Sequence, residues 1–69
     1  MNREEWLRAF CERIGVEPPS KEEAAELLEL AATAAHDSER PAAPLACWAV
    51  GRSDRSVAEL GRIAREVSS

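Results

Sequence analysis

Few residues of this chain have side chains that could do chemistry, and they are widely spread. There is one histidine, His36, and there are two cysteines, Cys11 and Cys47. A structural zinc site is built from ligands paired at short spacing, which these three residues lack. A cysteine–histidine nucleophile would also need an oxyanion donor and an orienting residue in one pocket, for which so short a chain has little room. We therefore expect no catalytic residue, no metal and no cofactor, with both thiols reduced and packed as small apolar groups.

Three arginines, Arg40, Arg52 and Arg55, flank an uncharged segment, Pro41 to Gly51. Arginine suits bidentate capture of carboxylate or phosphate, so one interpretation is a site for a nucleotide or pterin anion. The other interpretation is electrostatic stabilisation of helix ends, with ion pairs inside the chain. The nearest acidic partners in sequence are Asp37, Glu39 and Asp54.

A carrier domain is a further alternative, because acyl carriers are acidic four-helix domains of similar size. Their prosthetic arm is attached to a serine in an Asp-Ser-Leu context at the start of a helix. The nearest match here has Arg55 between Asp54 and Ser56, with Val57 in place of leucine. The motif is not satisfied, so the carrier interpretation ranks below the others.

Composition limits the function classes further. The chain has 69 residues, 9 Lys and Arg, 13 Asp and Glu, and a net charge of −4, with both signs interspersed. Nucleic-acid binding needs a concentrated basic face, which this pattern does not provide. No apolar run is long enough to span a bilayer, and the first residues lack the apolar region of a signal peptide. We expect one cytoplasmic domain, residues 1–69, with a thin core.

The pattern predicts four helices and no strand. Asn2 with Glu5 and Ser20 with Glu23 form two capping boxes, and Gly15 is placed to end the first helix. The first helix carries an apolar stripe at three- and four-residue spacing. Its members are Trp6, Leu7, Phe10, Cys11 and Ile14.

The second helix has an alanine- and leucine-rich face opposite a polar one, which we expect to be solvated. The polar residues are Glu22, Glu26, Glu29 and Thr33. In the last helix, Gly61 lies among apolar residues expected to face inward, and it indicates a close approach between helices. The inward residues of that helix are Val57, Leu60, Ile63, Ala64 and Val67.

The uncharged segment is predicted to be the central element of the fold. Pro41 suits a helix start and Gly51 a helix end. Its larger residues point to several sides, so we expect a helix at about 42–51 that neighbours enclose, with Trp48 buried. The predicted fold is all-α: a compact bundle of four short helices around this apolar helix. Such enclosure would also leave no room for a reaction centre.

The segment His36 to Leu45, with Glu39, Arg40 and Pro41 within it, resembles a known family. This family is a small helical domain of unknown function from high-GC Gram-positive bacteria. It occurs alone or fused to the guanylyltransferase that completes the molybdenum cofactor as its guanine dinucleotide form. The opening Glu5 to Leu7 and the turn Gly15 to Pro19 resemble the same family. The resemblance implies a cytoplasmic accessory role near molybdenum-cofactor assembly, and it implies no catalytic residues.

The leading hypothesis is accordingly a non-catalytic interaction domain, with a nucleotidyltransferase as its protein partner. The candidate contact residues are His36, Glu39, Arg40 and Arg52. The competing hypothesis is a binder of small anions, nucleotides or pterins. Self-association through an exposed Trp6 or Phe10 is a third alternative.

Overall fold

The computed structural model describes residues 1–69 as four α-helices joined by short connections, with no strand. The all-α prediction with four short helices is confirmed. No helix combines the length and the hydropathy that a membrane span requires. The helices are α1 (Arg3–Ile14), α2 (Lys21–Asp37), α3 (Ala42–Arg52) and α4 (Val57–Ser68).

Three of the four helices begin at a side-chain cap. The Asn2 side chain accepts from the Glu5 amide at 2.8 Å, and the Glu5 carboxylate accepts from the Asn2 amide at 3.0 Å. The same reciprocal pair joins Ser20 and Glu23, at 3.1 and 2.9 Å. Ser56 caps α4 through one such bond. Both predicted capping boxes are present, and each satisfies amides that the first helical turn leaves unpaired.

The helix ends distinguish two glycines. Gly15 ends α1 in the left-handed region, with φ 76°, and it is the only residue with positive φ. Gly51 was expected to end α3 in the same way, but the helix continues through Arg52 to Ser53. The sequence signal of a glycine after an apolar run therefore predicted one helix end correctly and placed the other one residue early.

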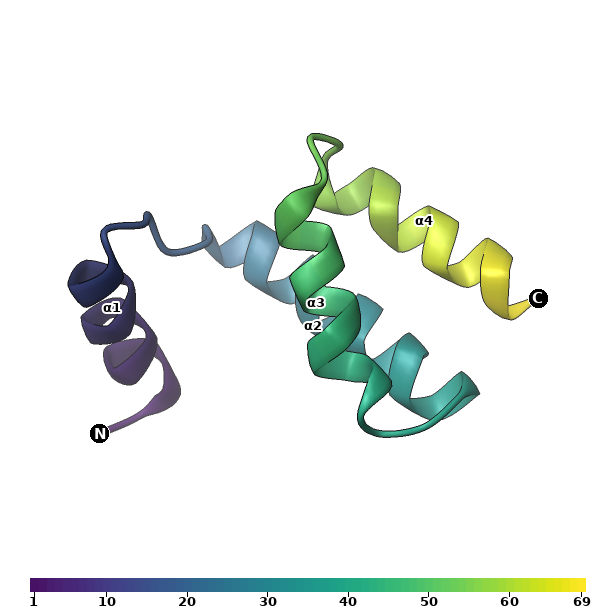
Figure 1. Ribbon diagram of the computed structural model, residues 1–69, viewed down its shortest axis with the longest axis horizontal. Helices are drawn as coiled ribbons and strands as arrows, with labels where there is room; N and C mark the ends of the chain where they lie inside the picture. Colours follow the sequence, from purple (N-terminus) through teal and green to yellow (C-terminus); the bar gives the residue numbers. More distant parts are fainter.

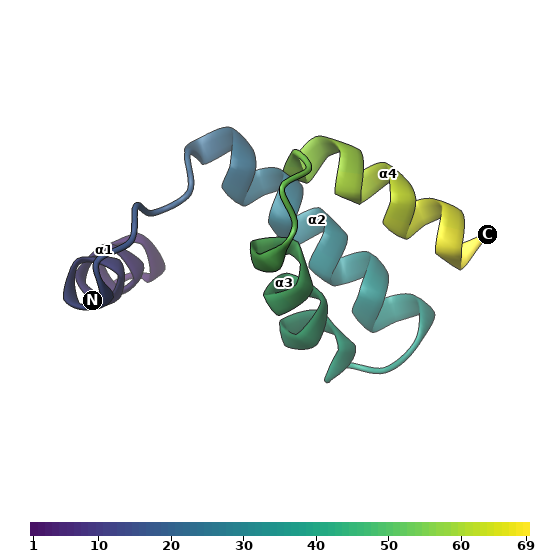
Figure 2. The same cartoon turned by 45° about the horizontal axis from the view of Figure 1, so that its top comes forward.

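Helix α2 is the element on which the others are assembled. Both α3 and α4 pack against it, whereas α1 makes no comparable contact with any other helix. Figures 1 and 2 show α1 standing apart at one end of a molecule 37 × 24 × 18 Å in extent, joined to α2 by an extended connector. The connector contains Pro18 and Pro19, which hold the chain in extended conformations.

The expectation that α3 is enclosed by its neighbours is wrong. Leu45 is 69% exposed and Trp48 is 67% exposed. The half-buried residues of α3 recur every three or four positions and so form the face that packs on α2. They are mostly small: Ala42, Ala43, Ala46, Cys47 and Val50. Because small side chains let two helices approach closely, the large residues of this apolar segment remain on the outer side.

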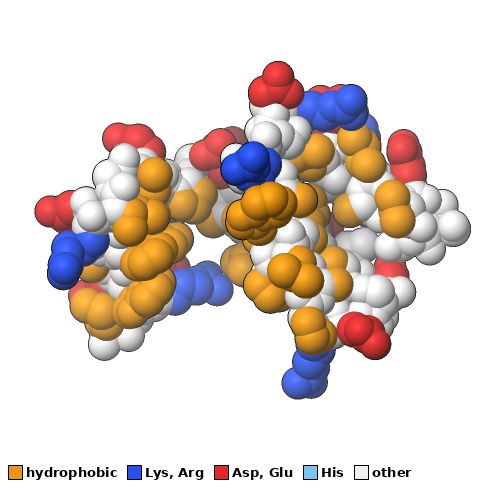
Figure 3. Space-filling model, in the orientation of Figure 1, with side chains coloured by type: hydrophobic (Ala, Val, Ile, Leu, Met, Phe, Trp, Pro, Cys, Tyr) orange, Lys and Arg blue, Asp and Glu red, His pale blue; other side chains and the backbone are white.

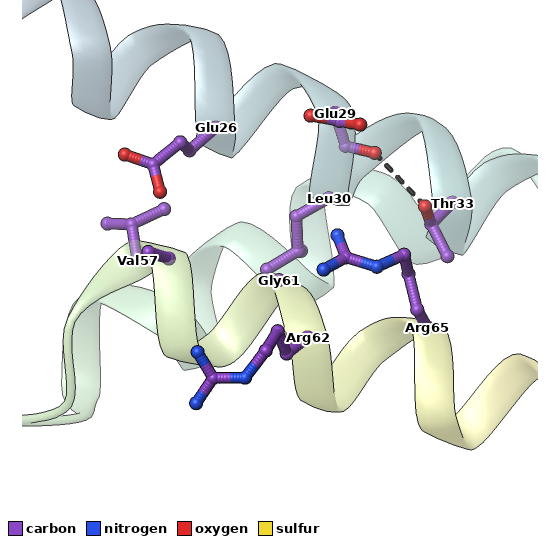
Figure 4. Close-up of a pocket in the computed structure, with 9 residues that line it drawn as sticks. Glu26, Glu29, Leu30, Thr33, Val57, Gly61, Arg62 and Arg65 are labelled. Atoms are coloured by element: carbon purple, nitrogen blue, oxygen red, sulfur yellow. Dashed lines mark hydrogen bonds between the residues drawn. The ribbon is translucent and has the colours of Figure 1, made fainter.

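The core is thin, as expected for a chain of this size. Only Cys11, Leu30 and Gly61 are buried, and no side chain is completely removed from solvent. Leu30 points from α2 toward Gly61 of α4 (Figure 4). Val67, expected to face inward, is 81% exposed because it lies in the last turn of α4. Packing between α2 and α4 is thus concentrated around one leucine and one glycine.

Candidate interaction surface

The outer side of α3 presents large apolar groups to solvent beside a cation. The Arg52 guanidinium lies over the Trp48 ring, 5.1 Å from its centroid. A cation–π contact at an exposed site contributes about 0.5–1 kcal/mol, so the pair holds both side chains in a defined arrangement. Leu45 lies one helical turn away toward the start of α3. Leu45, Trp48 and Arg52 form what we call the α3 face.

The other three predicted contact residues lie at the opposite end of α3. His36 is in the last turn of α2, and Glu39 and Arg40 are in the turn before α3. All three are exposed. A helix of 11 residues is about 16 Å long, so the structure separates Arg52 from this polar turn by roughly that length. The four residues therefore flank one helix but do not form a single cluster.

The end of α2 does not depend on His36. Ser38, the residue after the helix, donates a hydrogen bond from its hydroxyl to the Ala34 carbonyl at 2.6 Å. A carbonyl of the last turn is thereby satisfied by a serine rather than by the imidazole. The His36 side chain is left at the surface, next to Glu39 and Arg40 in sequence.

The three arginines considered for an anion site do not converge. Arg40 and Arg52 lie at opposite ends of α3. The Arg55 guanidinium approaches the Glu59 carboxylate of α4 at 3.8 Å, so its partner is not Asp54. Such an exposed pair contributes little to stability. No arrangement of two arginines around one phosphate is formed here.

Neither cysteine is placed for nucleophilic chemistry. Both thiols are free; Cys11 is buried in α1 and Cys47 is half-buried on α3. Burial raises the pKa of the Cys47 thiol, which lowers the fraction of reactive thiolate. No three His, Cys, Asp or Glu side chains lie together as a metal-binding group. Because Trp48 is exposed, α3 is not enclosed, and the argument that enclosure leaves no room for a reaction centre no longer applies.

A hollow of about 450 Å³ lies between α2 and α4 (Figure 4). Glu26, Glu29 and Thr33 line it, although their face of α2 was expected to be solvated. Thr33 donates a hydrogen bond to the Glu29 carbonyl at 3.2 Å, which satisfies its hydroxyl within the helix. Arg65 of α4 also lines this space. The mixed charges and open form of this hollow give no defined ligand geometry.

A second hollow, of about 780 Å³, separates α1 from the first half of α2. Its lining includes Leu7 of α1 and Leu28 of α2. Three further apolar residues of α1 are exposed: Trp6 at 53%, Phe10 at 46% and Ile14 at 55%. We call these three the α1 stripe. Figure 3 shows hydrophobic side chains gathered along α1 and over α3 on the same side of the molecule.

Sequence reasoning missed Leu45 and Trp48 as surface residues because it used polarity to separate inner from outer faces. In an uncharged segment polarity carries no such information. The spacing of small residues does, since Ala42, Ala46 and Val50 recur every four positions. That pattern of side-chain size could have identified the face that packs on α2.

Comparison with curated proteins and with solved structures gave no match. Comparison with protein families gave one, to the domain of unknown function DUF6457, over residues 1–68. The match covers all four helices, including the detached α1. The chain therefore belongs to this family of domains of unknown function.

Proposed function

We propose that this domain is a non-catalytic protein-interaction module that acts in molybdenum-cofactor assembly. Its partner would be the guanylyltransferase that forms the guanine dinucleotide form of the cofactor. The resemblance of the segment His36 to Leu45 supports this biological setting. The exposed α3 face supports the interaction role, independently of the resemblance.

The observation that carries the interaction role is the exposure of Leu45 and Trp48. Trp and Arg are the residue types most often found as energetic anchors of protein interfaces. Here Arg52 is stacked on Trp48, so the two are already oriented before a partner binds. A preorganised anchor loses less conformational entropy on association than a mobile one.

The polar turn at the start of α3 would supply specificity. His36, Glu39 and Arg40 are exposed and carry both signs of charge beside an apolar face. Polar groups at the rim of an interface select partners by charge complementarity, whereas apolar groups at its centre supply most of the affinity. In this proposal the partner contacts α3 along its outer side and the turn that precedes it.

The test measures binding of the purified domain to the guanylyltransferase by biolayer interferometry. Trp48→Ala should weaken binding by about 30-fold or more, as expected for loss of an interface anchor. Glu39→Ala combined with Arg40→Ala should also weaken it. The matched control is Arg65→Ala combined with Glu66→Ala, an exposed pair on α4, which should bind normally.

Helical circular dichroism of each variant shows whether a loss of binding comes from unfolding. If the folded wild-type domain does not bind the enzyme, the proposed partner is wrong. If binding persists in Trp48→Ala and in the Glu39, Arg40 variant alike, the assigned surface is wrong.

A further inference from the structure

The chain exposes more surface than a monomer of its mass should. Its accessible surface is 5692 Å² at 7.6 kDa. The relation between area and mass for folded monomers gives about 4,300 Å² for this mass. The excess is therefore about 1,400 Å² per chain by the same relation. An excess of this size indicates that a substantial face is covered by something outside the isolated chain.

Two apolar surfaces are exposed on the chain. One is the α1 stripe, in which the Trp6 and Phe10 rings stack with centroids 5.1 Å apart. The other is the α3 face, with Leu45 and Trp48. Hydrophobic side chains of both helices face the same way in Figure 3. A large exposed apolar patch marks an interaction site on a soluble protein.

The connector explains why α1 does not cover the α3 face of its own chain. Gly15 sets the exit direction from α1 through its left-handed backbone, and Pro18 and Pro19 stiffen the segment that follows. The two surfaces consequently lie side by side rather than face to face. Short, stiff hinges between elements are the usual setting for exchange of a helix between copies.

We propose that the chain forms a two-fold symmetric dimer in which the α1 stripe of each copy packs on the α3 face of the other. This rests on the proposed function, because it takes the same apolar surface to be an interface. In the isolated domain its occupant is a second copy, which the guanylyltransferase would have to displace. The α1 stripe and the α3 face lie on the same side of each chain, and the two-fold axis runs between the two helices, parallel to that side. Rotation about this axis places the α1 stripe of each copy opposite the α3 face of the other.

An area equal to the excess would be enough for a stable dimer. Burying the excess on both copies would remove about 2,800 Å² in total, within the roughly 2,000–5,000 Å² of obligate homodimers. The contact is isologous, since α1 meets α3 twice, and it therefore closes at two copies. The residue types also fit, because aromatic side chains are enriched at the centres of such interfaces.

Sedimentation equilibrium of the 69-residue chain over a range of concentrations tests the dimer. The expected mass is twice 7.6 kDa. Phe10→Lys and Leu45→Glu each place a charge at the proposed contact and should raise the dissociation constant by about 30-fold or more. The matched control is Val67→Lys, an apolar residue of α4 that is 81% exposed and outside both surfaces, which should remain dimeric.

A mixing experiment tests the pairing of α1 with α3. Phe10→Lys and Leu45→Glu chains, each monomeric alone, should associate when mixed. In the mixed dimer one α1–α3 contact is native. In the other, the introduced lysine of α1 faces the introduced glutamate of α3. If instead α1 packed on α1 and α3 on α3, each contact of the mixed dimer would place a charged side chain against an apolar one. Mixing would then not restore association.

A monomer at all concentrations overturns the proposal, and so does a dimer that survives both substitutions or a mixture that stays monomeric. Failure of this proposal is distinguishable from failure of the proposed function, because binding to the guanylyltransferase is measured on the Phe10→Lys chain, whose α3 face is unchanged. A wild-type monomer that binds the guanylyltransferase refutes only the exchange of α1. A wild-type dimer whose monomeric Phe10→Lys variant does not bind the enzyme refutes only the assigned partner.

Discussion

Replacing Gly61 by alanine should stabilise the protein, although a buried glycine in a helix interior usually indicates a helix contact too close for a methyl group. A β-carbon built at this position meets one atom within 4 Å, the Arg65 Nη1 at 3.8 Å. That distance is ordinary van der Waals contact, and the atom is the end of a flexible side chain. Leu30, which points at Gly61 from α2, leaves room for the added carbon.

The magnitude follows from the backbone alone. Gly costs about 1 kcal/mol relative to Ala in a helix interior, and loss of unfolded-state freedom accounts for about 0.4–1 kcal/mol of such substitutions. We therefore expect Gly61→Ala to raise the free energy of unfolding by about 0.5–1 kcal/mol. For a domain of this size the melting temperature should rise by about 2–8 °C.

The assay is urea and thermal unfolding followed by circular dichroism, with all variants at one protein concentration. Gly15→Ala is the matched control, because its β-carbon also meets open space but its φ is 76°. A left-handed alanine costs about 1–2 kcal/mol, so this variant should be destabilised. If Gly61→Ala is destabilised as well, α2 and α4 approach more closely than described and the reasoning fails.

Three other predictions concern a cap, a thiol and the α3 face. Ser20→Ala should lower the free energy of unfolding by about 1 kcal/mol, whereas Ser68→Ala, in the last turn of α4, should leave it unchanged in the same urea titration. Burial raises the pKa of the Cys47 thiol above 9.0, so the thiol of the unfolded state loses its proton at a lower pH than that of the folded state. The contribution of this group to the free energy of unfolding is therefore constant at lower pH and falls above about pH 9. Cys47→Ala should lack this part of the decline between about pH 8 and pH 10. Trp48→Ala, made in the Phe10→Lys chain to keep it monomeric, should lower the unfolding free energy by no more than about 1 kcal/mol, which is the contribution of the contact with Arg52. A loss of about 3–5 kcal/mol is typical of a core tryptophan and would show that Trp48 is buried and α3 enclosed.

The local signals of the sequence predicted the helices well because each depends on neighbouring residues. Asn2 and Ser20 each lie three residues before a glutamate, and that spacing alone specifies a capping box. Gly15 before an extended Pro-Pro segment predicted the end of α1. These features depend on short-range geometry, which a sequence states directly.

The arrangement of the helices could not be predicted with the same success. Hydrophobicity identified Pro41 to Gly51 as apolar but could not show which side would meet a neighbour, because all sides are apolar. The polar side of α2 around Glu26 and Thr33 faces a hollow next to α4 rather than open solvent. Which surfaces meet depends on side-chain size and on the connectors, and neither appears in a polarity pattern.

His36, Glu39 and Arg40 were predicted from the motif that resembles a known family, and Arg52 from its place beside the uncharged segment. All four are exposed in the structure. Their distribution was not predicted: His36, Glu39 and Arg40 are at one end of the helix and Arg52 at the other. The largest apolar contributors to the surface, Trp48 and Leu45, were assigned to the interior. Their exposure changes the expected interface from a small polar turn to a longer face with an aromatic centre.

The dependence of α3 and α4 on α2 has a consequence for motion. Each packs on α2, and they make no comparable contact with each other, so either can detach while the other stays in place. Amide hydrogen exchange should then be slowest in α2, whose opening requires both to release it, and separately faster in α3 and α4. One of these two helices can therefore detach to admit a binding partner while the other stays packed on α2.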